Sequence, residues 1–218
     1  MDIRSLLIPA SIGLLAALSA PTDAADEPPH AVVFRDGAIE YRDYAPQIIA
    51  TVEVGGSMDR AGNSGFRPLA GYIFGGNTAR DGDGAEEIAM TTPVTQARSQ
   101  EIAMTTPVTQ SDSGNGAWQV SFIMPTRWTM DTLPIPDDPR VALEEVPARR
   151  LAVIRFSGGA SDSRFEAKAA ELSAYLSDTG QVMIGTPIYA RYDPPWVPTP
   201  FRRNEVMIEI QGERSVAP

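Results

Sequence analysis

The segment best suited to hold a ligand is proline-rich and aromatic, and arginines follow it directly. Residues 194–201 contain four prolines together with Trp196 and Phe201. Arg202 and Arg203 come next. Prolines keep such a segment extended, so its aromatic side chains are displayed at little cost in ordering. Because guanidinium groups match the geometry of carboxylates, the chemistry suggested is non-covalent binding of an apolar molecule that carries carboxylates.

The same residues have a structural alternative. The aromatic side chains can pack the segment onto the rest of the protein, since most large aromatic residues are buried. The arginines can form ion pairs with nearby carboxylates, Asp193 or Glu205. Asn204 can serve as a turn residue. The residues taken alone leave both interpretations open.

The composition excludes several classes of site. The chain has 218 residues, a net charge of −10, no cysteine and one histidine, His30. Without cysteine there are no disulfides, thiolate nucleophiles, zinc–thiolate sites, iron–sulfur clusters or covalent c-type haem. One histidine leaves no catalytic triad and no multi-histidine metal site. The acidic surplus repels phosphate backbones and anionic lipids, so we expect neither nucleic acid nor a membrane surface as partner.

Paired carboxylates are the remaining groups for acid–base chemistry. Two adjacent pairs occur, at residues 86–87 and 144–145. Adjacent residues of a strand point to opposite faces, so neither pair is a ready acid–base couple. We therefore expect no catalytic residue and no metal site. A small-molecule hydrolase stays an alternative, because carboxylates far apart in the sequence can still meet in a fold.

The N-terminus has the pattern of a targeting segment. An apolar run over residues 6–20 has 15 residues, fewer than the ~20 that a membrane-spanning helix needs. Small residues at 22–25 predict cleavage near Ala25, so residues 1–25 are interpreted as a cleaved signal peptide, with an uncleaved anchor as the alternative. We expect a flexible lead over residues 26–38, a single domain over residues 39–211, no membrane insertion after cleavage, and a periplasmic or secreted protein.

Apolar periodicity predicts two similar units. Period-two alternation predicts strands over residues 39–44 and 47–54, paired across Ala45-Pro46. Apolar residues then recur at helical spacing over residues 66–74, which predicts a helix there. The second half repeats this order, with a helix that has a capping box at Ser163 and Glu166, the apolar stripe Phe165, Ala169, Leu172 and Leu176, and a terminal Gly180. Two strand-strand-helix-strand-strand units predict an α+β fold in which two helices cover a curved antiparallel sheet or a distorted barrel.

A ten-residue repeat interrupts the first unit. Residues 87–96 recur letter for letter at residues 101–110. One duplication is too short for a solenoid, whose units have ~20 residues or more. Its Thr-rich, β-branched composition favours extended structure, and Pro93 and Pro107 confine each copy to an edge, a bulge or the end of a strand. Which copy supplies the ordinary strand stays open.

Five segments together resemble the SOUL haem-binding protein family. They are GFRPLAGYIFGGN at residues 65–77, the IAMTTPV copies, FIMP at 122–125, YDPPW at 192–196 and RRNEV at 202–206. The resemblance covers about residues 39–210. It implies a pseudo-two-fold distorted antiparallel β-barrel flanked by two helices. It also implies non-covalent, reversible binding of haem or another tetrapyrrole in an apolar cleft between the first helix and the loop before the last strand.

Carried onto this sequence, the resemblance places the cleft between residues 66–74 and 194–203. The expected contact residues are Phe66, Arg67, Leu69, Ile73, Pro195, Trp196, Phe201, Arg202 and Arg203. The expected ligand is haem b without a strong protein axial ligand, because His30 lies beside the predicted cleavage site and methionines mostly fill cores. We expect a carrier or buffer in the cell envelope. The alternative to ligand binding is an envelope interaction module that has the fold and no ligand. The sequence leaves the oligomeric state open.

Overall fold

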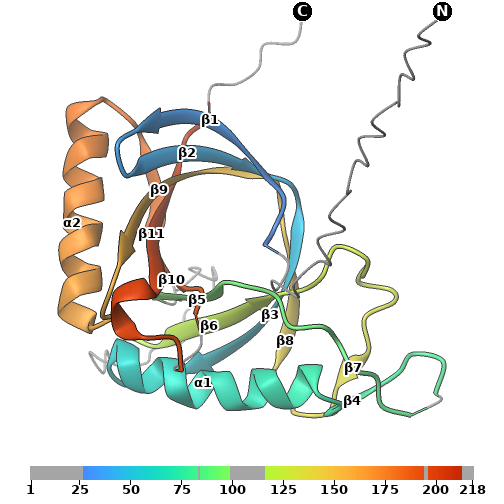
Figure 1. Ribbon diagram of the computed structural model, residues 1–218. Helices are drawn as coiled ribbons and strands as arrows, with labels where there is room; N and C mark the ends of the chain where they lie inside the picture. Colours follow the sequence, from blue (N-terminus) through green and yellow to red (C-terminus); the bar gives the residue numbers. More distant parts are fainter. Residues whose placement is uncertain (1–26, 83, 99–115, 194–195, 213–218) are drawn as a thin grey trace, which may run out of the picture.

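The structure, a computed structural model, describes residues 27–82, 84–98, 116–193 and 196–212. Two helices lie outside a strongly curved antiparallel sheet (Figure 1). The elements in chain order are β1 (His30–Asp36), β2 (Ile39–Tyr44), β3 (Gln47–Val54), α1 (Met58–Ile73), β4 (Asn77–Thr78), β5 (Val94–Arg98), β6 (Trp118–Ile123), β7 (Ile135–Pro136), β8 (Ala142–Val146), β9 (Arg149–Ser157), α2 (Asp162–Asp178), β10 (Met183–Arg191), η1 (Thr199–Phe201) and β11 (Arg203–Ile210).

The sheet topology confirms the two predicted units. Its strand order is β1-β2-β9-β11-β10-β5-β6-β3-β8, and neighbouring strands are antiparallel. The part of this order from β2 to β8 has a pseudo-two-fold symmetry. It stays the same when it is read backwards and β2, β3, β5 and β6 are exchanged with β8, β9, β10 and β11, respectively. The two units therefore pack side by side, with β5 of one paired to β10 of the other.

The sheet is not closed into the barrel that the resemblance implies. Its end strands are β1 and β8, and within the described residues each pairs with one neighbour, β2 or β3. β1 occupies the edge of β2 that would otherwise face β8. The predicted pairing of β2 with β3 is also wrong: β2 pairs with β1 and β9, and β3 pairs with β6 and β8. The two strands separate because the apolar face of β2 is buried with α2 and that of β3 with α1.

α1 begins eight residues before the predicted helix, at Met58. The prediction missed its first half because Gly62 and Gly65 lower helix propensity by about 1 kcal/mol each. Gly65 is required by packing, since a Cβ there would lie 2.7 Å from the Cβ of Val120 on β6. The missing side chain lets the helix approach the sheet closely. Leu69, Tyr72 and Ile73 then fill the core between α1, β3 and β6.

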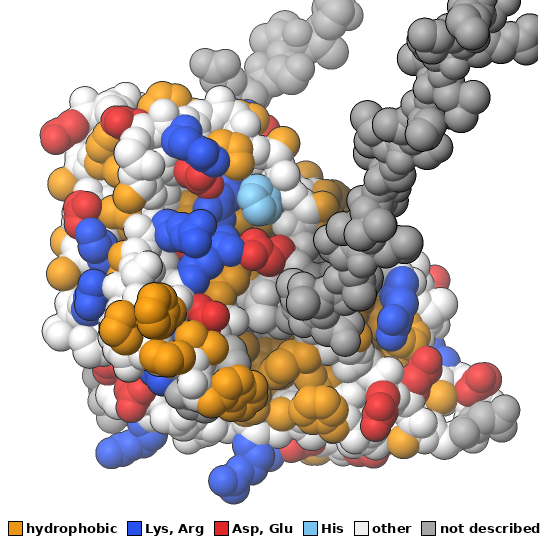
Figure 2. All heavy atoms as spheres, in the orientation of Figure 1, with side chains coloured by type: hydrophobic (Ala, Val, Ile, Leu, Met, Phe, Trp, Pro, Cys, Tyr) orange, Lys and Arg blue, Asp and Glu red, His pale blue; other side chains and the backbone are white. Residues whose placement is uncertain are grey.

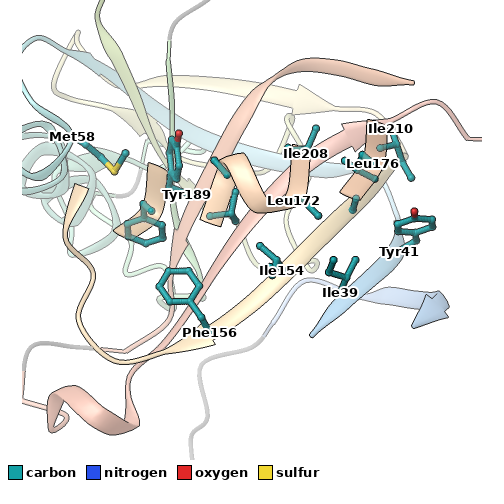
Figure 3. Close-up of a cluster of buried hydrophobic side chains, with 14 of the residues drawn as sticks. Ile39, Tyr41, Met58, Ile154, Phe156, Leu172, Leu176, Tyr189, Ile208 and Ile210 are labelled. Atoms are coloured by element: carbon teal, nitrogen blue, oxygen red, sulfur yellow. The ribbon is translucent and has the colours of Figure 1, made fainter. Parts of the chain in front are cut away.

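α2 carries the predicted apolar stripe. Its members Phe165, Ala169, Leu172 and Leu176 are buried against β9, β10 and β11, together with side chains from β2 (Figure 3). Gly180 has a φ of 72° just past the helix end, as predicted. The predicted capping box is wrong: the N-cap is Ser161, and it makes no side-chain capping hydrogen bond.

The N-terminal part differs from the prediction of a flexible lead over residues 26–38. Residues His30–Asp36 form the edge strand β1, which pairs with β2. The ring of His30, predicted to lie in a tail, stacks on Tyr44 with centroids 5.0 Å apart, and its Nδ1 is 3.0 Å from the carbonyl oxygen of Pro28. The predicted signal peptide lies outside the described residues. Among the described helices, none has the length and apolar character needed to cross a membrane.

The first copy of the repeat runs into the sheet, and its last three residues, 94–96, begin β5. Pro93 directly precedes β5, so this copy has its proline at a strand end, as predicted. β5 pairs with β6 on one side and β10 on the other, and therefore joins the two units. The second copy lies outside the described residues. The strand that the fold needs is thus present without it.

Deleting residues 97–110 tests this conclusion. The deletion joins Gln96 to Ser111, leaves one copy of the repeat, and gives the same chain as removal of residues 87–100. The deletion places Ser111 and Asp112 at the two β5 positions held by Ala97 and Arg98, and otherwise shortens the connection to β6. We expect the same fold and a free energy of unfolding within about 1 kcal/mol of wild type, because shortening a connection changes its closure entropy only slowly. Urea denaturation followed by circular dichroism measures this. Loss of cooperative unfolding would show that a single copy is insufficient.

Candidate functional site

Large aromatic side chains project into solvent from α1 and from the segment around η1. The exposed fractions are 40% for Phe66, 63% for Phe74, 80% for Trp196 and 77% for Phe201. Hydrophobic side chains gather over α1 and η1 on the face shown in Figure 2. Exposed apolar patches of this kind mark binding sites more often than chance. We call these four residues the aromatic surface.

Backbone contacts hold the η1 segment so that its aromatic rings stay outside. The amide of Phe201 donates to the carbonyl of Pro198 at 2.9 Å, and Arg202 Nε donates to the carbonyl of Val197 at 2.8 Å. The amide of Gly158 donates to the carbonyl of Arg202 at 3.0 Å, which ties the segment to the loop before α2. The segment is therefore fixed by its backbone and by the Arg202 side chain, and the rings of Trp196 and Phe201 remain exposed.

A chain of polar contacts connects this loop to the start of α1. Gln96 Nε2 donates to the carbonyl of Met58 at 2.9 Å, and the Arg191 guanidinium donates to Gln96 Oε1 and to the carbonyl of Ala160. Arg191 also lies over the ring of Phe165, 4.8 Å from its centroid, and burial lowers the pKa of its guanidinium. These contacts could not be predicted from the sequence, because they depend on the pairing of β5 with β10.

Along α1, the predicted contact residues divide between surface and core. Phe66 is half-exposed and packs edge-on against Phe122 at 5.3 Å, and Arg67 is exposed. Leu69 and Ile73 are 0% and 1% exposed and belong to the core under α1. The helix thus brings Phe66 and Arg67, but not the other two, to the surface. Pro195 lies outside the described residues.

Arg202 and Arg203 point to different surroundings. Arg203 stacks on Tyr192, 3.9 Å from the ring centroid, and forms ion pairs with Glu27 at 2.5 Å and Glu205 at 2.8 Å. Its amide donates to Asp193 at 2.5 Å. The ion pair with Glu205 is the structural alternative that the sequence left open. Whether Arg202, on the η1 side, contacts a ligand stays a prediction.

Glu205 is the centre of a buried charge network. It is 0% exposed and accepts hydrogen bonds from Arg42 at 2.9 and 3.1 Å and from the Tyr192 hydroxyl at 2.6 Å. Burial raises the pKa of Glu205, but the hydrogen bonds and charge of Arg42 outweigh it, and the pKa lies below its usual value. Burial and the adjacent Glu205 raise the pKa of Tyr192. A carboxylate held ionised by these partners stabilises the sheet and is poorly suited to accept a proton in catalysis.

The described part of the chain contains no candidate metal site, because no three His, Asp or Glu side chains come together there. The adjacent carboxylates Glu144 and Glu145 are exposed on the edge strand β8.

Comparisons with known proteins agree with the motifs. The family model described as SOUL heme-binding protein matches residues 25–209. No curated protein matches the chain. Among solved structures, EcmrR in its DNA complex has a TM-score of 0.56 at 10% identity, over 79% of this chain and 57% of that one. The isolated EcmrR C-terminal domain has a TM-score of 0.52 at 10% identity, over 79% and 96%.

A hydrolase from Listeria innocua has a TM-score of 0.51 at 13% identity, over 79% of this chain and 91% of that one. At such low identities these structures share the fold with this chain and indicate nothing of its activity. The family model, in contrast, matches most of the sequence, including every segment on which the resemblance rests. The chain belongs to the SOUL heme-binding protein family.

Proposed function

We propose that the protein binds haem, or another tetrapyrrole, non-covalently and reversibly on the aromatic surface, as a carrier or buffer in the cell envelope and not as an enzyme. The observation that carries this proposal is the exposure of Phe66, Phe74, Trp196 and Phe201, between 40% and 80% each. An aromatic side chain buries 150–250 Å² when it is covered, so a flat macrocycle gains substantial contact here. The envelope location rests on the predicted signal peptide.

The charged side chains near this surface, and the position of the histidine, fit haem b that is bound through the faces of its ring. Arg67 is exposed beside Phe66, and Arg202 lies at the end of η1, so both are suited to pair with propionates. The sole histidine, His30, lies in β1 and stacks on Tyr44 of β2. We therefore propose that burial of the porphyrin supplies the affinity and that no strong protein ligand holds the iron.

Titration with haemin tests this function. We expect a saturable shift of the Soret band with the wild-type protein. Trp196→Ala and Phe201→Ala should each weaken binding about 10- to 30-fold, the range of central aromatic contacts in binding sites. The matched control is Phe34→Ala, an exposed phenylalanine on β1 that is outside the surface and should leave the affinity unchanged.

Two outcomes would count against the proposal. An unchanged Soret band with wild-type protein would refute tetrapyrrole binding and favour the interaction module. Saturable binding that survives both aromatic substitutions would retain the ligand but refute this surface as its site.

A further inference from the structure

The position of β5 in the sheet, between β6 and β10, is filled by residues of the repeated sequence. Val94, Thr95 and Gln96 pair with strands on both sides. β5 and β10 are the strands at which the two units of the sheet meet. We call this position the β5 slot. The segment that fills it holds the two units together.

Three anchors of the first copy lie within the ten repeated residues. Ile88 is 2% exposed and belongs to the core under α1. The hydroxyl of Thr91 donates to the carbonyl of Ile123. Gln96 is 1% exposed, and its side chain bridges the start of α1 and the Arg191 guanidinium. The second copy has the same ten side chains, so the slot fits it equally well.

The residues on either side of the repeat do not exclude the second copy from the slot. Before the first copy, Asn77 binds the backbone amide and carbonyl of Glu86, and Gln100 has the same backbone groups before the second copy. After the first copy, Ala97 is half-buried, and the matching Ser111 differs by one hydroxyl. Both flanks are therefore compatible with either copy.

The connections at the two ends of the slot allow the same exchange. With the first copy in place, eight residues (79–86) connect β4 to the repeat, and 19 residues (99–117) connect β5 to β6. Because the copies are 14 residues apart, the second copy would change these lengths to 22 and five residues. Closure entropy depends on the logarithm of loop length, so the cost at one end is nearly offset by the gain at the other.

The five-residue connection has the composition of a hairpin loop. It consists of residues 113–117, Ser-Gly-Asn-Gly-Ala. Arg98 lies opposite Trp118 in the observed pairing, so Asp112 would take that place when the second copy fills the slot. Connections of three to five residues that contain glycine are typical of β-hairpins. The sequence after the second copy therefore favours its entry into the slot.

We propose that the β5 slot accepts either copy of the repeat, so that the folded protein exchanges between two arrangements of the same sheet. The occupant is a segment of this chain, residues 87–96 in one arrangement and residues 101–110 in the other. Strand order and core are the same in both, and the arrangements differ in which connection is long. One chain populates two packings when their free energies are similar.

Truncation of the same isoleucine in one or both copies tests the exchange by urea denaturation of the full-length protein. Ile88→Ala and Ile102→Ala should each change the unfolding equilibrium constant by no more than about threefold, because the intact copy fills the slot. The double variant should change it by at least about 30-fold, the lower end of the cost of truncating a buried isoleucine.

Ile208 is the matched control, because it is also 2% exposed and has no second copy. Ile208→Ala alone should have the large effect of the double variant. An effect of Ile88→Ala or Ile102→Ala as large as that of the double variant would overturn the proposal. A double variant as stable as wild type would overturn it too, since the slot would then not depend on this side chain.

Cross-linking identifies the occupant directly, since the chain has no cysteine of its own. Thr95 lies opposite Ser121 on β6, and Thr109 is the matching residue of the second copy. Opposite residues of antiparallel strands lie within the Cα separation of a disulfide. Thr95→Cys and Thr109→Cys, each combined with Ser121→Cys, should therefore both oxidise to an intramolecular disulfide. Ser113→Cys with Ser121→Cys is the matched control and should not.

The outcomes distinguish exchange from its alternatives. A disulfide in only one of the two threonine variants would show a single occupant and overturn the proposal. A disulfide between chains, seen as a dimer in non-reducing electrophoresis, would place the second copy in the slot of another molecule and overturn exchange within one chain. The isoleucine variants decide the proposal independently of the yield of either cross-link.

Discussion

Replacing Glu205 with alanine is expected to lower the free energy of unfolding by about 3–5 kcal/mol, the cost of leaving one partner of a buried ion pair without the other. Arg42 is 3% exposed and directs both terminal guanidinium nitrogens at this carboxylate. The substitution also removes the acceptor of the Tyr192 hydroxyl. Urea denaturation at neutral pH measures the loss. A change below about 1 kcal/mol would contradict it.

The matched control is an ion pair at the surface. Glu171 is 54% exposed and pairs with Lys168 one helical turn away on α2. Glu171→Ala should change the free energy of unfolding by less than about 1 kcal/mol, because exposed pairs are screened by water and salt. The contrast between the two glutamates isolates the effect of burial from that of charge.

The pH dependence gives a second measurement on Glu205. Because its pKa is lower in the folded protein than the usual value of 4.5, its stabilisation is fully present above about pH 4.5 and is lost as the pH falls through the folded-state pKa. The pKa values of Glu40 and Asp43 are lowered too, so the whole protein should lose stability in the same direction. The stability difference between wild type and Glu205→Gln should therefore shrink below pH 4.5.

Replacing Leu69 with alanine is expected to lower the free energy of unfolding by about 2–5 kcal/mol, the usual cost of emptying a fully buried leucine site. Leu69 is 0% exposed and packs with Tyr72 and Phe122 between α1 and the sheet. Trp196→Ala is the control: Trp196 is 80% exposed, so its removal should change stability by less than about 0.5 kcal/mol.

The same two variants distinguish a residue of the hydrophobic core from a residue that contacts the ligand. In the folded state, Leu69→Ala should bind haemin as wild type does, whereas Trp196→Ala should bind it more weakly at unchanged stability. The haemin titration is therefore made at a temperature where both variants are folded. Weaker binding by folded Leu69→Ala would show that Leu69 contacts the ligand, as the family resemblance implies.

Local periodicity was sufficient to predict individual elements. The bounds of β2 and β3 follow from period-two alternation, and the stripe of α2 follows from helical spacing. Strand partners were not predictable in this way, since alternation is the same whichever strand lies alongside. The first half of α1 was missed for a related reason: Gly65 disfavours a helix locally but is needed for contact with Val120.

The site could be predicted only where exposure follows from local structure. Prolines around η1 predict displayed aromatic side chains, and Trp196 and Phe201 are displayed. A helix stripe predicts burial without saying whether protein or ligand covers it, and in Leu69 the protein does.

The unjoined ends of the sheet affect how the protein can deform. In a closed barrel, the number of strands and their stagger fix the circumference. Here the described residues link β1 only to β2 and β8 only to β3, so the spacing between the two end strands can vary with every ladder hydrogen bond intact. A cavity of about 400 Å³ lies inside the curved sheet and is lined by residues of β2, β3, β5, β6, β8, β9, β10 and β11. The width of this cavity is therefore not fixed by a closed ring of strands.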